Sequence, residues 1–228
     1  MEILSKLGVL LGAYLIGAIP FGFLMVYLTT GKDVRDIQSG RTGGTNAMRA
    51  AGFLVGLSTA ILDILKGAGT VWLAKYFFPD NYWLIAFAPV FAILGHNYSI
   101  FLAQRNDEGK LKLGGGAGGA ASLGGSLGFW WPSGIIIFIL AVLIFYFVGY
   151  ASVTTISIAL LSTFIFAYKA IVDGWPWAYA VYGLIATSLL LWSLRPNIKR
   201  LLAGDDRLHG FRKTMRDRAE AKEKAAKE

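Results

Sequence analysis

Cysteine is absent from this 228-residue chain, and charged residues make up only 16% of it. Without cysteine there is no disulfide, no thiolate nucleophile and no cysteine-ligated metal. A soluble domain of this length carries about 25% charged residues, so the composition disfavours an ordinary globular protein. Neither a metal-binding cluster nor a cofactor fingerprint is present. We therefore expect no metal and no cofactor.

Hydrophobic residues make up 55% of the chain, and several apolar runs reach the roughly 20 residues that a helix needs to cross a bilayer. The pattern predicts an all-α, polytopic membrane protein with about seven transmembrane or membrane-embedded helices. We place them at residues 4–30, 48–77, 82–104, 117–130, 133–149, 152–171 and 175–194. The first run is too long for the apolar region of a signal peptide.

The net charge of +8 reflects the orientation in the membrane better than it reflects nucleic-acid binding. Basic residues gather in alternate connections and in the tail; they are Lys32, Arg35, Arg41, Arg49, Arg105, Lys110, Lys112 and those from Arg195 onward. The positive-inside rule then places the N-terminus outside and the C-terminus in the cytoplasm of a bacterial inner membrane. Residues 1–195 would form the membrane domain. Residues 196–228 would form a charged cytoplasmic tail. Its last part, from about Phe211 to Glu228, would be either a solvated helix or a frayed end, and its basic residues could also rest on anionic membrane lipids.

The connection at residues 39–49 is dense in hydrogen-bonding groups. Ser39 and Thr45 carry hydroxyls, Asn46 carries an amide and Arg49 a guanidinium fork, and glycines lie between them. Backbone N–H groups, hydroxyls and a guanidinium together suit a phosphate. The alternative is a flexible connector whose arginine faces lipid phosphates.

Three of the ionisable residues inside predicted membrane helices, Asp63, Lys66 and His96, are candidates for the site. Asp63 and Lys66 share one face of a helix because they are three residues apart. Buried charges in a membrane usually pair and face a polar interior, so they form either a structural ion pair or part of a substrate site. His96 is either a hydrogen-bonding or proton-handling group near that site or a histidine satisfied by a neighbouring helix.

Glycines 114–116, 118 and 119 open the short helix at 117–130. Gly114, Gly115, Gly116, Gly118 and Gly119 would let the backbone approach a phosphoryl group at a helix N-terminus. Close packing between helices is the alternative use of such a run.

The segment Arg195-Pro-Asn197-Ile-Lys-Arg200 follows the last predicted helix. Asn197 and Arg200 either return to the same cytoplasmic cavity or anchor the helix at the membrane surface.

With these residues the sequence resembles the bacterial acyl-phosphate:glycerol-3-phosphate acyltransferase family. The resemblance runs from about residue 12 to residue 201, nearly the whole membrane domain. The matching segments, in order, are Ala18-Ile-Pro20-Phe-Gly22, residues 39–49, Asp63-Ile-Leu-Lys66-Gly67, Gly95-His96 and Asn197-Ile-Lys-Arg200-Leu201.

The resemblance implies seven membrane helices with an external N-terminus. It implies transfer of a fatty acyl group from acyl phosphate to the 1-hydroxyl of glycerol 3-phosphate, giving lysophosphatidate in phospholipid synthesis. Ser39, Arg49 and Asn197 would bind the phosphate of glycerol 3-phosphate, and the glycine loop would hold the acyl phosphate.

The chain departs from the family pattern at four positions. Ala117 stands where a lysine is usual and Leu194 where a histidine is usual, while Arg41 replaces an asparagine and Ser99 a proline. Lys110, Lys112 or Arg41 could restore the positive charge that Ala117 lacks.

Two other readings remain. The departures allow a divergent homologue that binds a phosphorylated lipid or metabolite without turnover, and the Gly-rich helix starts allow a small transporter. Against the transporter, the polar motifs all lie on one predicted side.

Overall fold

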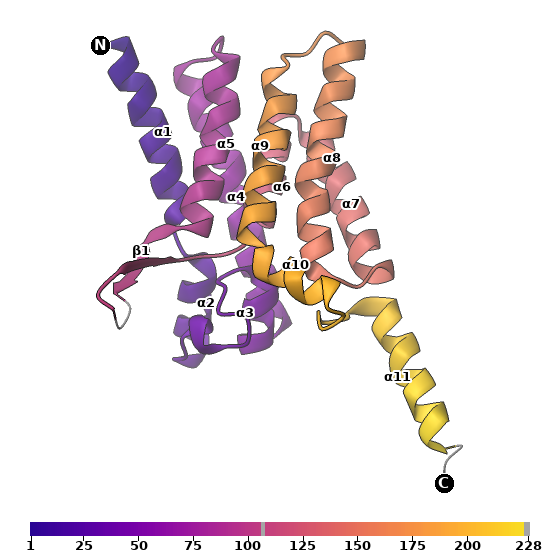
Figure 1. The fold of residues 1–228 in the computed structure, drawn as a ribbon. Coiled ribbons are helices and arrows are strands. Elements are labelled where there is room, and N and C mark those ends of the chain that lie inside the picture. The colour runs from indigo at the N-terminus through magenta and orange to yellow at the C-terminus, as the bar shows by residue number, and fades with distance from the viewer. Residues whose placement is uncertain (106–107, 226–228) are drawn as a thin grey trace.

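The computed structural model describes residues 1–105 and 108–225. Long helices stand side by side in a bundle (Figure 1). They are α1 (Glu2–Ala18), α4 (Phe53–Phe77), α5 (Tyr82–Asn97), α7 (Trp131–Phe147), α8 (Ala151–Val172) and α9 (Ala178–Ser193). The shorter α6 (Gly119–Phe129) packs between α4 and α8. The N-terminus lies at one end of the bundle and the C-terminus beyond the other (Figure 1).

The short elements gather at the end opposite the N-terminus (Figure 1). They are α2 (Phe21–Thr30), the 3-10 turn η1 (Val34–Asp36), α3 (Gly44–Ala51), the strands β1 (Ser99–Arg105) and β2 (Leu111–Gly114), and α10 (Arg195–Leu202). From this end α11 (Gly210–Ala225) projects away from the bundle (Figure 1). Of the two alternatives for the last part of the tail, the helix is the one observed up to Ala225, where the described residues end.

Two predicted helices are interrupted. The helix expected over 4–30 breaks between α1 and α2 at Pro20, which has no N–H to continue the ladder. The helix expected over 48–77 breaks at Gly52, whose φ of 91° lies in the region that favours glycine. The second break separates α3, an amphipathic helix at the bundle end, from the apolar α4.

The helix expected over 82–104 is wrong in its second part. The helix α5 ends at Asn97, and the chain continues as β1, which pairs with β2 in an antiparallel hairpin. The hydroxyl of Ser99 donates to the carbonyl of Ala18 over 2.6 Å and so ties the start of the hairpin to the end of α1. Residues 100–103 form an unbroken apolar run, which extended the predicted helix. The segment is a strand because residues 111–114 pair with it.

The predicted number of seven membrane helices is not confirmed. Within the described residues, three runs are long and apolar enough to cross a membrane: Glu2–Thr30, Phe53–Phe77 and Ala151–Val172. The pair α9 and α10, bent by 68°, would make a fourth. The helices Tyr82–Asn97 and Trp131–Phe147 are apolar but shorter.

Glycines set the spacing of the tightest helix pairs. A Cβ on Gly17 of α1 would overlap the carbonyl of Ala92 in α5, and one on Gly95 would overlap the carbonyl of Tyr14 in α1. The same closeness holds α6 against α4, where Gly124 has no room for a Cβ beside the carbonyl of Ile64. Small residues let membrane helices approach backbone to backbone, where dispersion contacts replace the hydrophobic effect.

We predict that Gly17→Ala destabilises the protein by about 1–3 kcal/mol, because the added methyl group must displace backbone rather than a flexible side chain. The measurement is thermal unfolding in detergent. Gly8→Ala is the matched control, since Gly8 lies on the same helix and a Cβ there meets nothing within 4 Å. Equal stability of the two variants would refute the close-packing argument.

Candidate active site

A cavity of about 420 Å³ opens at the end of the bundle that carries α2, α3 and α10. Its walls come from segments that are far apart in the sequence: residues 39–49, the facing parts of α4 to α8, and residues 194–209. Most of the residues expected at the site line it; they are Ser39, Thr45, Asn46, Arg49, His96, Gly118, Gly119, Asn197 and Arg200. The fold therefore brings together motifs that the sequence could only relate by order.

Five expected site residues do not line this cavity: Lys66, Lys112, Gly114, Gly115 and Gly116. Lys112 is exposed on β2. Gly115 and Gly116 lie behind the wall, where a Cβ on either would overlap residues 96–97 at the end of α5. The first part of the glycine run thus packs closely against α5, which is the alternative use considered above, and its last part faces the cavity.

The glycine loop is tied to its neighbours through the backbone. The N–H of Gly116 donates to the carbonyl of His96 over 2.9 Å, and the N–H of Thr42 donates to the carbonyl of Gly115 over 3.2 Å. Gly118, with a φ of 91°, then turns the chain into α6. The N-terminus of α6, with its free N–H groups, is thereby aimed at the cavity.

Arg41 joins three segments at the cavity wall. Its guanidinium donates to the carbonyl of Gly116 over 3.1 Å and to the hydroxyl of Ser193 over 3.0 Å, and also to the carbonyl of Ser193. Burial lowers the pKa of Arg41, and the nearby positive charge of Arg200 lowers it further. The side chain remains cationic, because the ordinary pKa of arginine is far above neutral pH. A positive charge therefore lies beside the glycine loop, next to Ala117.

Asp63, Lys66 and His96 form a buried cluster. Asp63 Oδ1 lies 2.8 Å from Lys66 Nζ and 3.5 Å from His96 Nδ1, and neither contact has good hydrogen-bond geometry, so charge dominates. Lys66 Nζ also donates to the carbonyl of Ile19 over 3.0 Å. Asp63 and His96 reach the cavity, whereas Lys66 lies behind them. In this arrangement Lys66 serves as the internal ion-pair partner.

Asn46 holds the loop in place. Its Nδ2 faces the carbonyls of Val34, Ile37 and Arg41 at 2.9–3.0 Å. The side chain is 2% exposed, so its donors are used inside the loop. Asn46 thereby fixes the path of the segment between η1 and α3. This segment carries Ser39 and Arg41.

Three cavity residues escaped the sequence argument: Asp206, Arg207 and His209. The hydroxyl of Ser152 donates to Asp206 Oδ2 over 2.9 Å, and Arg49 Nη2 lies 3.0 Å from His209 Nε2. The sequence feature that could have indicated this stretch is the pair of glycines that flank it. Gly204 and Gly210 lie in turns, with φ of 79° and 61°.

The cavity has one cationic end and one apolar wall. Arg41, Arg49, Arg200 and Arg207 outnumber Asp63 and Asp206, and Asp63 is already paired with Lys66. The apolar wall comes from α6 to α8 and consists of Leu123, Phe138, Ala141, Val142, Phe145 and Ile158. Phe138 and Val142 are 53% and 50% exposed, so this wall continues onto the outer face of the bundle. Such a cavity suits a molecule with an anionic head and an apolar chain.

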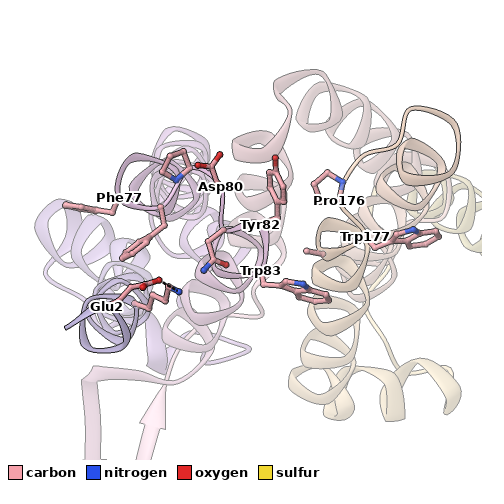
Figure 2. Close-up of a pocket in the computed structure, with 12 residues that line it drawn as sticks. Glu2, Phe77, Asp80, Tyr82, Trp83, Pro176 and Trp177 are labelled. Atoms are coloured by element: carbon pink, nitrogen blue, oxygen red, sulfur yellow. Dashed lines mark ion pairs between the residues drawn. The ribbon is translucent and has the colours of Figure 1, made fainter.

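A second cleft of about 630 Å³ lies at the opposite end of the bundle (Figure 2). Tyr82, Trp83 and Trp177 line it, and beside it the Lys6 ammonium lies 2.6 Å from Glu2. No residue expected at the site lies there. Aromatic residues at helix ends are typical of a membrane–water interface.

No three His, Asp or Glu side chains lie close enough to hold a metal ion within residues 1–105 and 108–225. The polar groups that line the cavity are arginines, hydroxyls, amides, imidazoles, the carboxylates of Asp63 and Asp206, and backbone N–H groups.

The apolar helices of this bundle, with a cavity at one end, define the class as that of an integral membrane protein. The family model described as glycerol-3-phosphate acyltransferase matches residues 7–204. The chain belongs to the glycerol-3-phosphate acyltransferase family.

Curated relatives and solved structures agree with this. The chain is 36% identical over 201 residues to the glycerol-3-phosphate acyltransferase of Bartonella quintana, covering 87% of this chain and 89% of that one. It is 35% identical over 208 residues to that of Parasynechococcus marenigrum, covering 90% of each. It is also similar to the crystal structure of PlsY (YgiH), an integral membrane glycerol 3-phosphate acyltransferase, in the glycerol 3-phosphate form. That likeness has a TM-score of 0.78 and 28% identity over 92% of this chain and 98% of that one.

These likenesses confirm the resemblance stated from the sequence and the all-α membrane fold class. They also confirm the enzyme class, acylation of glycerol 3-phosphate in phospholipid synthesis.

Proposed function

We propose that this enzyme takes its acyl group from acyl phosphate and transfers it to the 1-hydroxyl of glycerol 3-phosphate, releasing lysophosphatidate and inorganic phosphate. The observation that carries the proposal is the cavity with a cationic end and an apolar wall. Both substrates are anions, and one of them also carries a hydrocarbon chain. The cationic end suits the two phosphates, and the wall from α6 to α8 suits the chain.

Glycerol 3-phosphate is proposed to bind at the α3 side of the cavity. Ser39, Thr45 and Arg49 come from the 39–49 segment, and Asn197 and Arg200 come from α10. Two hydroxyls, an amide and two guanidinium groups provide donors for a phosphate with three acceptor oxygens. Burial, followed by the charge of Arg207, lowers the pKa of Arg49, which nevertheless stays protonated at neutral pH.

The acyl phosphate is proposed to bind at the start of α6. The N–H groups near Gly118 and Gly119 and the guanidinium of Arg41 would hold its phosphate. The other glycines of the run, Gly114 to Gly116, would act indirectly by holding the loop against α5. The acyl chain would then lie along Phe138 and its neighbours.

The reaction needs little covalent chemistry from the protein. Acyl phosphate is a mixed anhydride, so the 1-hydroxyl oxygen attacks the acyl carbon, an ester bond forms, and the bond from that carbon to the phosphate oxygen breaks. Arg41 and the backbone N–H groups stabilise the charge that gathers on the departing phosphate. Holding both substrates in one cavity supplies the remaining acceleration.

The hydroxyl proton also needs an acceptor. The second pKa of a phosphate monoester is about 6, so the phosphate of glycerol 3-phosphate itself can take the proton near neutral pH. We propose that His96 assists as a hydrogen-bonding group. Its Nδ1 faces Asp63, so its Nε2 is the nitrogen turned toward the glycine loop.

We predict that the purified protein in lipid vesicles makes lysophosphatidate from glycerol 3-phosphate and acyl phosphate, and does not do so from acyl-CoA. Product is measured by chromatography of the extracted lipids. The Ser39→Ala, Arg49→Ala double variant should lose the activity, because both changes remove phosphate donors. Product from acyl-CoA would overturn the proposed donor. Binding of glycerol 3-phosphate without product from either donor would instead identify a non-catalytic homologue.

We predict that Arg41→Ala lowers kcat/KM by about ten-fold or more, because it removes a charge-assisted contact at the leaving phosphate. Arg41→Lys should not restore it, since an ammonium cannot reach the same three acceptors. Lys112→Ala is the control, because Lys112 is exposed and outside the cavity. A reduced kcat/KM for Lys112→Ala together with a wild-type value for Arg41→Ala would reverse this assignment.

We further infer that the enzyme lies in the bacterial inner membrane with its N-terminus outside and its active site, with residues 196–228, in the cytoplasm. The distribution of charge supports this orientation, because the cavity end carries several arginines. At the other end the basic groups are already engaged. Lys6 pairs with Glu2, Lys75 donates to the carbonyl of Gly128 and Lys169 pairs with Asp173.

The cysteine-free sequence makes this orientation directly testable, since an introduced cysteine is then the sole thiol of the chain. Asp80, between α4 and α5, lies at the N-terminal end of the bundle (Figure 2), and Ala219 lies on α11. A membrane-impermeant maleimide added to spheroplasts should label Asp80→Cys and leave Ala219→Cys unlabelled until the membrane is opened. The opposite pattern would invert the topology.

A further inference from the structure

The segment between α10 and α11 folds back onto the active-site cavity. The backbone N–H of His209 donates to the carbonyl of Gly149 over 2.8 Å, and Asp206 accepts from the hydroxyl of Ser152. The imidazole of His209 stacks on the ring of Phe145, with centroids 5.2 Å apart and planes inclined by 22°. These contacts join the segment to α7 and to the start of α8, so its position over the cavity is fixed from several sides.

The backbone on both sides of this contact requires glycine. Gly149 has a φ of 80°, and a Cβ there would lie 2.7 Å from the carbonyl oxygen of His209. Gly210 has a φ of 61°, and a Cβ there would lie 2.5 Å from the carbonyl oxygen of Tyr146. The close approach of residues 209–210 to the end of α7 therefore depends on glycine at positions 149 and 210.

The imidazole of His209 contacts a residue of the proposed phosphate site. Arg49 Nη2 lies 3.0 Å from His209 Nε2. A guanidinium can only donate, so Nε2 accepts and the ring is neutral with its proton on Nδ1. Burial lowers the pKa of His209, the positive charges of Arg49, Lys213 and Arg207 lower it further, and Asp206 acts in the opposite sense. The neutral ring is thus the form present at pH 7.

We propose that His209 is a positioning residue for acyl transfer, which holds one arm of the Arg49 guanidinium so that its other N–H groups face the phosphate of glycerol 3-phosphate. The inference rests on the proposed role of Arg49. A guanidinium carries five N–H donors, and the contact with His209 uses one of them. His209 lies outside residues 7–204, the part of the chain that the family model matches.

The test is steady-state kinetics of the full-length protein in lipid vesicles. His209→Ala should raise KM for glycerol 3-phosphate by about ten-fold and leave KM for acyl phosphate within about two-fold, because Arg49 is freed at only one of the two phosphate sites. His209→Gln should restore most of the loss, since its Oε1 can accept from Arg49 where Nε2 did. In an Arg49→Lys background, His209→Ala should add little, because coupled residues are not additive.

The pH dependence gives a second readout. Protonation of His209 removes the acceptor for Arg49. Because the pKa of His209 is lowered, the wild-type KM for glycerol 3-phosphate should rise only at pH values below the ordinary histidine pKa of about 6.5. Glycerol 3-phosphate titrates in the same range, and the His209→Gln enzyme corrects for this because its amide does not titrate. As the pH falls, KM for glycerol 3-phosphate should rise more steeply in the wild type than in the His209→Gln enzyme.

Met215→Ala, a change of an exposed residue on α11, controls for general effects on the tail. The inference is overturned if His209→Ala keeps both KM values, or if it raises both equally, as a loosened tail would. A wild-type enzyme that makes no lysophosphatidate from acyl phosphate would instead overturn the proposed function. The two failures are therefore distinguishable in one set of measurements.

Discussion

The guanidinium of Arg41 is the contact on which the active site depends. It joins three parts of the chain: the 39–49 segment, the glycine loop at Gly116 and the end of α9 at Ser193. A planar group with donors on two sides can bridge such segments, which a lysine cannot do. The same charge stands beside the start of α6, where we propose that phosphate leaves. The structural and the chemical role of Arg41 therefore compete. Each hydrogen bond to the protein uses an N–H group that could otherwise donate to the substrate.

Around this contact, glycines and buried charges position the other helices that form the cavity. Gly17 and Gly95 bring α1 and α5 together, and the end of α5 then receives the glycine loop through the carbonyl of His96. Asp63 draws Lys66 and His96 to one place in the bundle interior. Because an unpaired charge is costly in a membrane, the cluster also fixes how α4 and α5 face each other. The cavity thus rests on closely packed helices, and its more exposed donors lie just before α3, at Ser39, and on α3, at Thr45.

Much of the fold was predictable because apolar runs and glycine patterns are local signals. The helices α6 to α9 lie close to their expected ranges, and most of the expected polar residues line one cavity. What could not be predicted depends on contacts between distant segments. Residues 99–105 become a strand because 111–114 pair with them, and Asn46 turns inward because three carbonyls meet there. The position of His209 over the cavity depends in the same way on Phe145 and Gly149.

The apolar wall that runs from the cavity to the half-exposed Phe138 and Val142 makes this a site between two phases. A water-soluble acceptor reaches it by diffusion in three dimensions, whereas an acyl-chain donor and its amphiphilic product travel in the plane of the bilayer. The concentration that governs saturation by the donor is then its mole fraction in the lipid, not its amount per volume of solution. Adding inert phospholipid to the vesicles at constant total donor should therefore slow the enzyme. It lowers the mole fraction of the donor and leaves the surrounding water unchanged.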